Sequence, residues 1–375
     1  MHGRKRVKPS AEVEKLRKEK EVTKIKEYRN LVESYFQKKD KKEFDNDALA
    51  LTTKILSQNP DFYSIWNFRR LILLNGLLKE CSEEDKQQTL STELVFLQEL
   101  FQLNPKSYWI FNHRRWCLET MQNPDWDKEL QLVGKFLELD ARNFHAWDYR
   151  RYVTSKLSCT TETSLTQIEF DFTTTKINQN FSNYSAWHQR SKLLPLLIKE
   201  KNLDEQEKKK LIDKEFELVK AAFYTDPDDQ SAWLYHWWLV AQGSIISTSQ
   251  MNEESKESSN SLNQNLSINT SERIELLQRE INVVRELLEL EPDSKYCLQT
   301  LANLLSELKS NVKEDSKKID DEIVTICDRL IKIDKFRTKR YEDLRSKKFK
   351  IERKIGILEI DIKINWPHLS ENNDK

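Results

Sequence analysis

One degenerate motif recurs along this chain at intervals of about forty residues. Its pattern is Asn/Asp-Pro-x-x-Tyr/Phe-x-x-Trp-x-x-Arg-Arg, and the clearest copy runs from Asn59 to Arg70. If the Trp of this pattern is taken as the anchor position, the copies place there Trp66, Phe111, Trp147, Trp187 and Trp233, followed by the weaker Leu298 and Tyr341. A repeat of this period predicts a fold of stacked, similar units, each burying its apolar face against its neighbours.

The spacing within each copy predicts two helices per repeat. The steps between the first five anchors are 45, 36, 40 and 46 residues, which indicates a constant core with loops of variable length and differs from the tetratricopeptide period of roughly 34. A first helix, 48–58 in the first copy, ends at the Asn/Asp-Pro pair because proline disfavours helix in the residue before it. A second helix, 63–78, then carries the Trp and the Arg pair. With only 5 Gly and 8 Pro in 375 residues, an all-α fold of antiparallel helical hairpins is predicted.

The Trp and Arg residues of the motif are interpreted as structural. A Trp with Arg three and four positions later shares one helix face with them, so we expect the Trp to fill the seam between hairpins. The Arg side chains are expected to bond carbonyls or carboxylates of neighbouring helices, because the planar guanidinium satisfies several acceptors at once. These residues are assigned to the structural repeat: Trp66, Arg69, Trp147, Arg150, Trp187, Arg190 and Trp233.

Composition limits the classes of function. A repeat of basic and aromatic residues can indicate binding of single-stranded nucleic acid, but 62 Lys and Arg are balanced by 62 Asp and Glu, so no nucleic-acid partner is predicted. The five Cys are scattered and no Cys-x-x-Cys occurs. We therefore expect reduced thiols, a cytoplasmic location and no zinc site in this chain. No secretory signal and no transmembrane segment are predicted, because no apolar run is long enough.

Four segments are expected along the chain. Residues 1–40 form a basic arm followed by a charged helix, and residues 41–345 hold the repeats. Residues 241–270 are dominated by Ser, Asn, Gln and Glu, so this segment cannot bury enough apolar surface to order itself and is predicted to be a disordered insertion. Residues 346–375 form a C-terminal tail.

The repeat resembles that of the protein prenyltransferase α subunits. Several copies match at the anchor, the Arg pair and the preceding Asn/Asp-Pro, over about 45–345. Resemblance implies a crescent-shaped superhelix of hairpins that wraps a separate β subunit, which holds zinc and the isoprenoid. Within the family, Met1 to Arg4 and Arg142 to Arg151 are similar to the α subunit of the type II enzyme, Rab geranylgeranyltransferase.

The type II resemblance implies a heterodimer that transfers geranylgeranyl from its diphosphate to C-terminal cysteines of Rab GTPases presented by an escort protein. The geranylgeranyl diphosphate would bind at the subunit interface, and the escort protein would bind the outward face of the crescent. Two alternatives stay open. One is the α subunit shared by farnesyltransferase and type I geranylgeranyltransferase, and the other is a non-catalytic helical scaffold.

Three residues match family positions that face the diphosphate. The resemblance assigns catalytic roles to Lys106, Tyr108 and His145; the respective alternatives are an exposed loop lysine, a packing aromatic and a satisfied interfacial histidine. Phe144 stands where farnesyltransferase α subunits more often have Tyr, so a hydroxyl is absent there. His2 is a candidate ligand for the partner's zinc, with a solvated terminal residue as its alternative.

Overall fold

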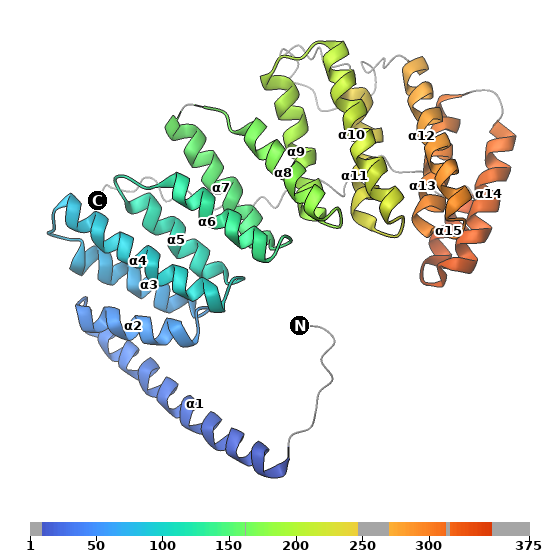
Figure 1. The fold of residues 1–375 in the computed structure, drawn as a ribbon. Helices are drawn as coiled ribbons and strands as arrows, with labels where there is room; N and C mark the ends of the chain where they lie inside the picture. The colour runs from blue at the N-terminus through green and yellow to red at the C-terminus, as the bar shows by residue number, and fades with distance from the viewer. Residues whose placement is uncertain (1–9, 162, 247–269, 313–315, 347–375) are drawn as a thin grey trace, which may run out of the picture. The chain divides into compact units, whose positions relative to one another are not determined.

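The computed structural model of the chain describes residues 10–161, 163–246, 270–312 and 316–346 (Figure 1). These residues form fifteen α-helices, one π-helical turn and one 3-10 turn, and they contain no strand. The predicted all-α fold of repeated helical hairpins is confirmed. The chain divides into two compact units, residues 1–176 and 177–375, and each is described by itself.

The first unit begins with one long helix and continues with hairpins. The elements that lie wholly within it are α1 (Ala11–Asp40), α2 (Asn46–Gln58), α3 (Tyr63–Ile72) with its π-helical extension η1 (Leu73–Leu77), α4 (Glu83–Leu103), α5 (Tyr108–Thr120), α6 (Trp126–Leu139) and α7 (Phe144–Thr161). The helices of each hairpin pack together, as α6 does on α7, and the second helices α3, α5 and α7 also lie side by side. The boundary between the units falls within α8 (Thr166–Gln179).

The second unit repeats the same plan. Its elements are α9 (Tyr184–Glu200), α10 (Glu205–Thr225), α11 (Gln230–Ile246), α12 (Thr270–Leu290), α13 (Lys295–Asn311), α14 (Ser316–Ile333), the 3-10 turn η2 (Lys335–Arg337) and α15 (Thr338–Arg345). The hairpins α10–α11, α12–α13 and α14–α15 each pack as pairs, and α11 lies beside both α9 and α13. All seven anchor residues of the chain are at most 4% exposed, so every copy of the motif, the weak ones included, delivers an apolar residue to the core.

Local sequence explains where the helices begin. Polar residues cap several of them: the side chain of Asp45 accepts from the amide of Ala48, and that of Ser82 accepts from the amide of Asp85. Asp204 and Glu207 form a reciprocal capping box at the start of α10. Each cap satisfies an amide that has no partner within its own helix.

The end of the first repeat differs from the sequence expectation. The second helix does not run regularly through 63–78, because α3 stops at Ile72 and continues as the π-helical turn Leu73–Leu77. Gly76 lies against the backbone of Phe44, and a Cβ at this glycine would come within 2.0 Å of the Phe44 carbonyl oxygen. Only glycine permits this close approach.

The long helix α1 joins the repeats through its second half. Tyr35 is its only buried residue among those described, and the Tyr35 ring meets the rings of Phe62 and Phe68 at centroid distances of 6.1 and 5.4 Å. The first half is exposed throughout most of its length, as its charged composition predicts.

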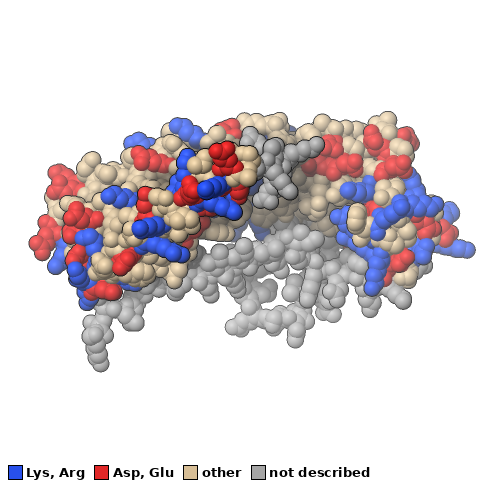
Figure 2. Space-filling view, turned by 90° about the horizontal axis from the view of Figure 1, so that it is seen from below, with Lys and Arg blue, Asp and Glu red and all other residues tan. Residues whose placement is uncertain are grey.

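The remaining segment predictions fall largely outside the described residues. Helix α11 continues to Ile246, into the range 241–270 predicted as an insertion, and the rest of that range, 247–269, is not described. Most of the basic arm, 1–9, and nearly all of the predicted tail, 347–375, are also outside. No helix in the described part is both long and apolar enough to cross a membrane. Charges of both signs are interspersed over much of the face in Figure 2.

Candidate functional site

Two loops of the first unit meet at the start of their second helices. These loops join α4 to α5 and α6 to α7, and Asn143 connects them. Its side-chain amide donates to the carbonyl oxygen of Pro105 at 2.9 Å, while its oxygen accepts from the backbone amides of His145 and Ala146. Asn143 is only 3% exposed, and its part-buried bond to Pro105 fixes the residues before α5 next to the first turn of α7.

Lys106 lies in the first of these loops and points to the second. Its Nζ is 2.9 Å from the Oδ2 of Asp140, and its side chain is 65% exposed. The hydrogen bond from Lys106 holds the pKa of the Asp140 carboxyl below its ordinary value. An exposed ion pair of this kind contributes little to stability because water competes for both partners. The ammonium group therefore remains accessible to an anion from solvent.

Tyr108 and His145 are in direct contact beside that lysine. The two rings meet edge to face with their centroids 4.1 Å apart, and Tyr108 is exposed while His145 is buried. Burial lowers the pKa of His145, and the positive charge of Lys106 acts in the same direction, whereas Asp148 opposes it. The imidazole is therefore neutral at pH 7, with one nitrogen able to donate a hydrogen bond and the other able to accept one.

The structure thus brings together all three residues assigned to the reaction by resemblance. The Lys106 ammonium, the Tyr108 hydroxyl and the His145 ring are carried by two adjacent hairpins near the N-termini of α5 and α7. The partial positive charge at a helix N-terminus adds to that of the ammonium group. Chemically, this arrangement suits an anionic group with several oxygens, such as a phosphate.

Aromatic side chains extend this surface along the first unit. Tyr63, Tyr108 and Phe144 are the first residues of α3, α5 and α7, and each is more than half exposed. The Tyr63 ring contacts Trp109 at a centroid distance of 5.5 Å, and Tyr108 contacts Phe144 at 6.2 Å. We call Tyr63, Tyr108, Trp109 and Phe144 the aromatic row. Adjacent exposed aromatic residues of this kind are typical of a binding surface.

The anchor Trp residues have a second bond that the motif does not reveal. Each indole Nε1 donates to the backbone carbonyl six residues upstream, in the loop before its own helix. The four bonds are Trp66 to Pro60, Trp147 to Ala141, Trp187 to Phe181 and Trp233 to Pro227, at 2.7 to 2.9 Å. This bond explains why the distance from the Pro position to the Trp is constant, since the indole fastens the loop that separates the two helices.

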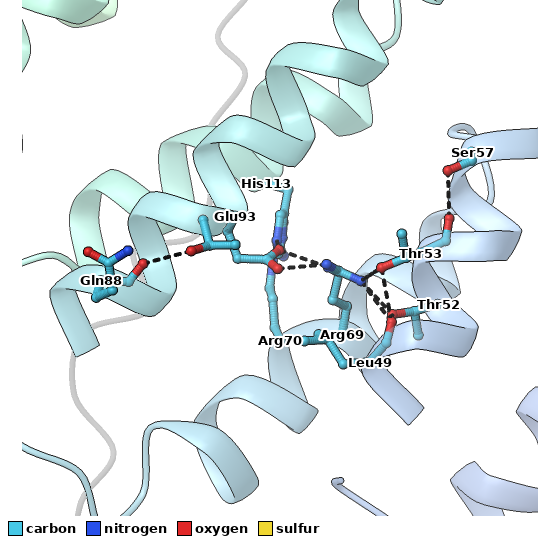
Figure 3. Close-up of polar contacts among 10 residues, drawn as sticks. Leu49, Thr52, Thr53, Ser57, Arg69, Arg70, Gln88, Glu93 and His113 are labelled. Carbon is cyan, nitrogen blue, oxygen red and sulfur yellow. Dashed lines mark hydrogen bonds and ion pairs between the residues drawn. The ribbon is translucent and has the colours of Figure 1, made fainter. Parts of the chain in front are cut away.

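The arginine three residues after the anchor is buried and paired with a glutamate. Its Nε and Nη2 atoms bond the two carboxylate oxygens of that glutamate, as Figure 3 shows for Arg69 and Glu93. The pairs are Arg69–Glu93, Arg114–Glu129, Arg150–Glu169 and Arg190–Glu215. In each pair the glutamate belongs to the first helix of the next repeat, so the ion pair spans successive hairpins.

The arginine four residues after the anchor lies nearer the surface. Arg115 and Arg151 both bond the exposed carboxylate of Asp148, and Arg70 contacts Nδ1 of His113. The two motif arginines therefore differ, although a shared face was expected for them. A helix turns about 100° per residue, so positions three and four fall on opposite sides of the anchor, one towards the seam and one towards solvent.

These glutamates were missed in the sequence, although a signal exists. Each of Glu93, Glu129, Glu169, Glu215 and Glu280 lies eighteen residues before the anchor of its own repeat. The residue two after that anchor often completes the cluster: His113 bonds Glu93, Tyr149 bonds Glu129, and Tyr235 bonds Glu215. In the fifth copy, His236 replaces the arginine and bonds Glu280 at 2.8 Å. Aligning the copies on the anchor would have revealed this acidic position.

Metal binding was predicted for the partner rather than for this chain. Among the described residues, no group of three or more His, Cys, Asp or Glu is placed to hold a metal ion. His2, the candidate ligand for the partner's zinc, lies outside the described residues. Both statements about zinc therefore stay predictions.

Comparison with known families identifies the repeat. A family model for the protein prenyltransferase alpha subunit repeat matches residues 45–76, 90–121, 126–157, 167–197 and 212–243. The five matched ranges contain the five strong anchors. Each also contains the arginine or histidine three residues later.

Two relatives match over nearly the whole chain, and a third matches over 64% of it. The geranylgeranyl transferase type-2 subunit alpha of Schizosaccharomyces pombe is 40% identical over 352 residues, covering 92% of this chain and 98% of that protein. The Candida albicans protein of the same name is 34% identical and covers 91% and 96%. The Rattus norvegicus protein of that name is 43% identical over 244 residues, but this chain covers only 42% of its length.

A solved structure supports the fold. It is described as Candida albicans protein geranylgeranyltransferase-I complexed with GGPP. One of its chains aligns with a TM-score of 0.61 over 86% of this chain and 90% of its own length, at 21% sequence identity. At that identity the likeness concerns the helical architecture alone.

Proposed function

The chain belongs to the protein prenyltransferase alpha subunit family, and on that premise we propose that it is the α subunit of a type II geranylgeranyltransferase. The observation that carries this proposal is its 40% identity over 98% of the Schizosaccharomyces pombe protein named as that subunit. The reaction would transfer a geranylgeranyl group from its diphosphate to C-terminal cysteine thiols of Rab GTPases. An escort protein would present the Rab substrate, and the enzyme would act in the cytoplasm.

The aromatic row is the proposed contact with the β subunit. It lies at the starts of three adjacent second helices and exposes large rings to solvent. Burial of such rings is a main source of affinity in stable heterodimers. Lys106, Tyr108 and His145 are part of the same surface, so β-subunit binding would bring these groups to the subunit interface, where the diphosphate is proposed to bind. The escort protein would bind a face of the hairpins that the β subunit leaves uncovered.

The chemistry at this interface requires stabilisation of the leaving group. As the carbon–oxygen bond breaks, negative charge builds up on the pyrophosphate oxygens, and cations and donors placed there lower the barrier. The Lys106 ammonium would exchange Asp140 for a phosphate oxygen. This exchange would cost little free energy, because the ion pair with Asp140 is exposed and weak. The Tyr108 hydroxyl and the neutral His145 would each donate a hydrogen bond to the same group. A zinc ion held by the β subunit would favour the deprotonated form of the Rab cysteine thiol, which is the attacking nucleophile.

Co-expression tests this assignment against the alternative of a subunit shared with farnesyltransferase. The full chain would be produced with a type II β subunit and, separately, with a farnesyltransferase β subunit. We expect a stable one-to-one heterodimer with the type II partner only. A stable complex with the farnesyltransferase β subunit alone would favour the alternative. If no stable complex formed with either β subunit, the result would favour the remaining alternative, a non-catalytic helical scaffold.

A further inference from the structure

One aromatic side chain in the second unit is fully exposed. Phe336 lies in η2 between Lys335 and Arg337, and its relative exposure is 103%, the highest among the exposed large apolar residues of the described segments. Single exposed apolar residues are common on proteins. A whole phenylalanine ring projecting from a tight turn is a different case, because nothing in the described part of the chain shields any of it.

Hydrogen bonds to the buried residue Asp334 hold the turn that carries Phe336. Asp334 is buried, and its carboxylate accepts from the Tyr341 hydroxyl at 2.8 Å and from Nη1 of Arg337 at 2.7 Å. The backbone carbonyl of Asp334 also accepts from the amide of Arg337. Tyr341 is the anchor of the last repeat and is 1% exposed. The projection of Phe336 therefore belongs to the folded core of the repeat and does not arise from fraying.

Four cationic residues lie close to Phe336 in the sequence, at the end of α14, in η2 and in α15. The side chains of Lys332, Lys335, Lys339 and Arg340 are all exposed, and none of them forms an ion pair with a carboxylate of the described residues. Lys and Arg gather at the right-hand end of Figure 2, where Figure 1 draws α13 to α15. We call Lys332, Lys335, Phe336, Lys339 and Arg340 the Phe336 patch.

We propose that the Phe336 patch docks onto the anionic surface of a lipid bilayer. Unpaired cations are attracted to acidic headgroups, and one projecting aromatic ring can enter the headgroup region without a matching pocket. An interface with another protein would instead place such a ring in a packed and desolvated site, where neighbouring apolar residues share the contact. Here the exposed residues next to Phe336 in the sequence are mainly cations, with one partly exposed apolar residue, Ile333, and this predominance of charge favours the bilayer. The inference concerns η2 and α15 only and does not depend on the proposed function.

Vesicle binding tests this directly. The full-length chain would be sedimented with vesicles of phosphatidylcholine alone and with vesicles that also contain phosphatidylserine, at low and physiological salt. We expect weak, reversible and salt-sensitive binding to the anionic vesicles only. Lys339→Glu/Arg340→Glu is expected to weaken it by about tenfold or more, and Phe336→Ala by about threefold to tenfold.

Matched variants in the same unit serve as controls. Lys209→Glu/Lys210→Glu makes the same charge change on α10, and Leu290→Ala truncates another exposed apolar residue at the end of α12. Both should bind vesicles as the wild type does. Equal binding to neutral and anionic vesicles, or an equal loss in the control variants, would overturn the proposal. So would binding of the patch to an acidic peptide such as polyglutamate without any binding to vesicles, because the surface would then be a protein-binding one.

Discussion

The guanidinium group of Arg69 forms a two-point ion pair with the carboxylate of Glu93, with atoms 2.8 and 2.6 Å apart. Both side chains are almost completely buried. The remaining nitrogen of Arg69 bonds the hydroxyls of Thr52 and Thr53, which lie on α2. One arginine of α3 thus ties the helix before it to the helix after it, and the same pairing with the next hairpin recurs in three further repeats.

Removing one partner of this pair should destabilise the chain strongly. Arg69→Ala would leave the Glu93 carboxylate buried without its cation, which typically costs about 3–5 kcal/mol. Replacing both residues by apolar ones of similar size, Arg69→Met/Glu93→Leu, should recover a large part of that loss. Denaturant unfolding of the three proteins measures these differences. A single variant as stable as the wild type would contradict the role given to this pair.

The stability of the first unit should fall as the pH is lowered. Burial lowers the pKa of His113 from 6.5 to about 4. Burial alone would raise the pKa of Glu93, but the His113 hydrogen bond and the Arg69 charge outweigh it and lower that pKa from 4.5 to about 2. Both groups therefore take up protons at a higher pH in the unfolded chain. Their stabilisation is complete above pH 6.5 and is lost as the pH falls, first through His113 and then through Glu93.

A single substitution at His113 separates its contribution to the pH dependence of stability from that of Glu93. His113→Gln places at this position the residue type that the fourth repeat carries as Gln189, and Gln does not titrate. Between neutral pH and about pH 4, the wild type should lose about 2–3 kcal/mol more of its free energy of unfolding than this variant. Identical pH dependence in the two proteins would show that His113 is not the group that titrates.

Gly76 and Gly134, the glycines in the described part of the first unit, provide a matched pair. Gly76→Ala would place its Cβ within 2.0 Å of the Phe44 carbonyl oxygen, whereas the nearest atom to a Cβ at Gly134 is 3.9 Å away. We expect Gly76→Ala to destabilise by about 1–3 kcal/mol and Gly134→Ala to be neutral or slightly stabilising within α6. Thermal melts of both variants test this. Similar melting temperatures for the two variants would contradict the close approach of Gly76 to the backbone of Phe44.

The sequence predicted the repeat and its helices because both depend on local spacing. Proline and cap residues set the helix ends, and the Trp anchors set the buried face. The glutamate partners were not predicted, since a partner such as Glu93 depends on which helix packs against Arg69. The bond from Asn143 to Pro105 was missed for the same reason. Placing Lys106, Tyr108 and His145 in one site relied on resemblance alone, because their separation in the sequence gives no indication of contact.

Lys106 allows the proposed catalytic role to be tested apart from assembly. In the heterodimer, Lys106→Ala should lower kcat, because the activation free energy should rise by about 2–4 kcal/mol. This is the typical effect of removing one donor that stabilises the developing charge. Lys128→Ala is the control, because Lys128 is another exposed lysine of the first unit and pairs with Asp125 of its own helix start. Steady-state geranylgeranyl transfer measures both variants.

The assembly state of the same proteins must be checked alongside. Both variants should co-purify with the β subunit as the wild type does, since the Lys106 side chain is largely exposed. If correctly assembled Lys106→Ala enzyme kept full turnover, the role of this lysine at the diphosphate would be refuted. Loss of turnover in the Lys128 variant to the same degree would also contradict it.

The most direct test of the proposed function is transfer of labelled geranylgeranyl by the heterodimer of this chain and a type II β subunit. A Rab GTPase would be supplied with and without escort protein, and a peptide ending in the Cys-aliphatic-aliphatic-X motif would be supplied in parallel. The account predicts transfer to the Rab protein only when the escort protein is present, and none to the peptide. Escort-independent transfer to the peptide would contradict the type II assignment.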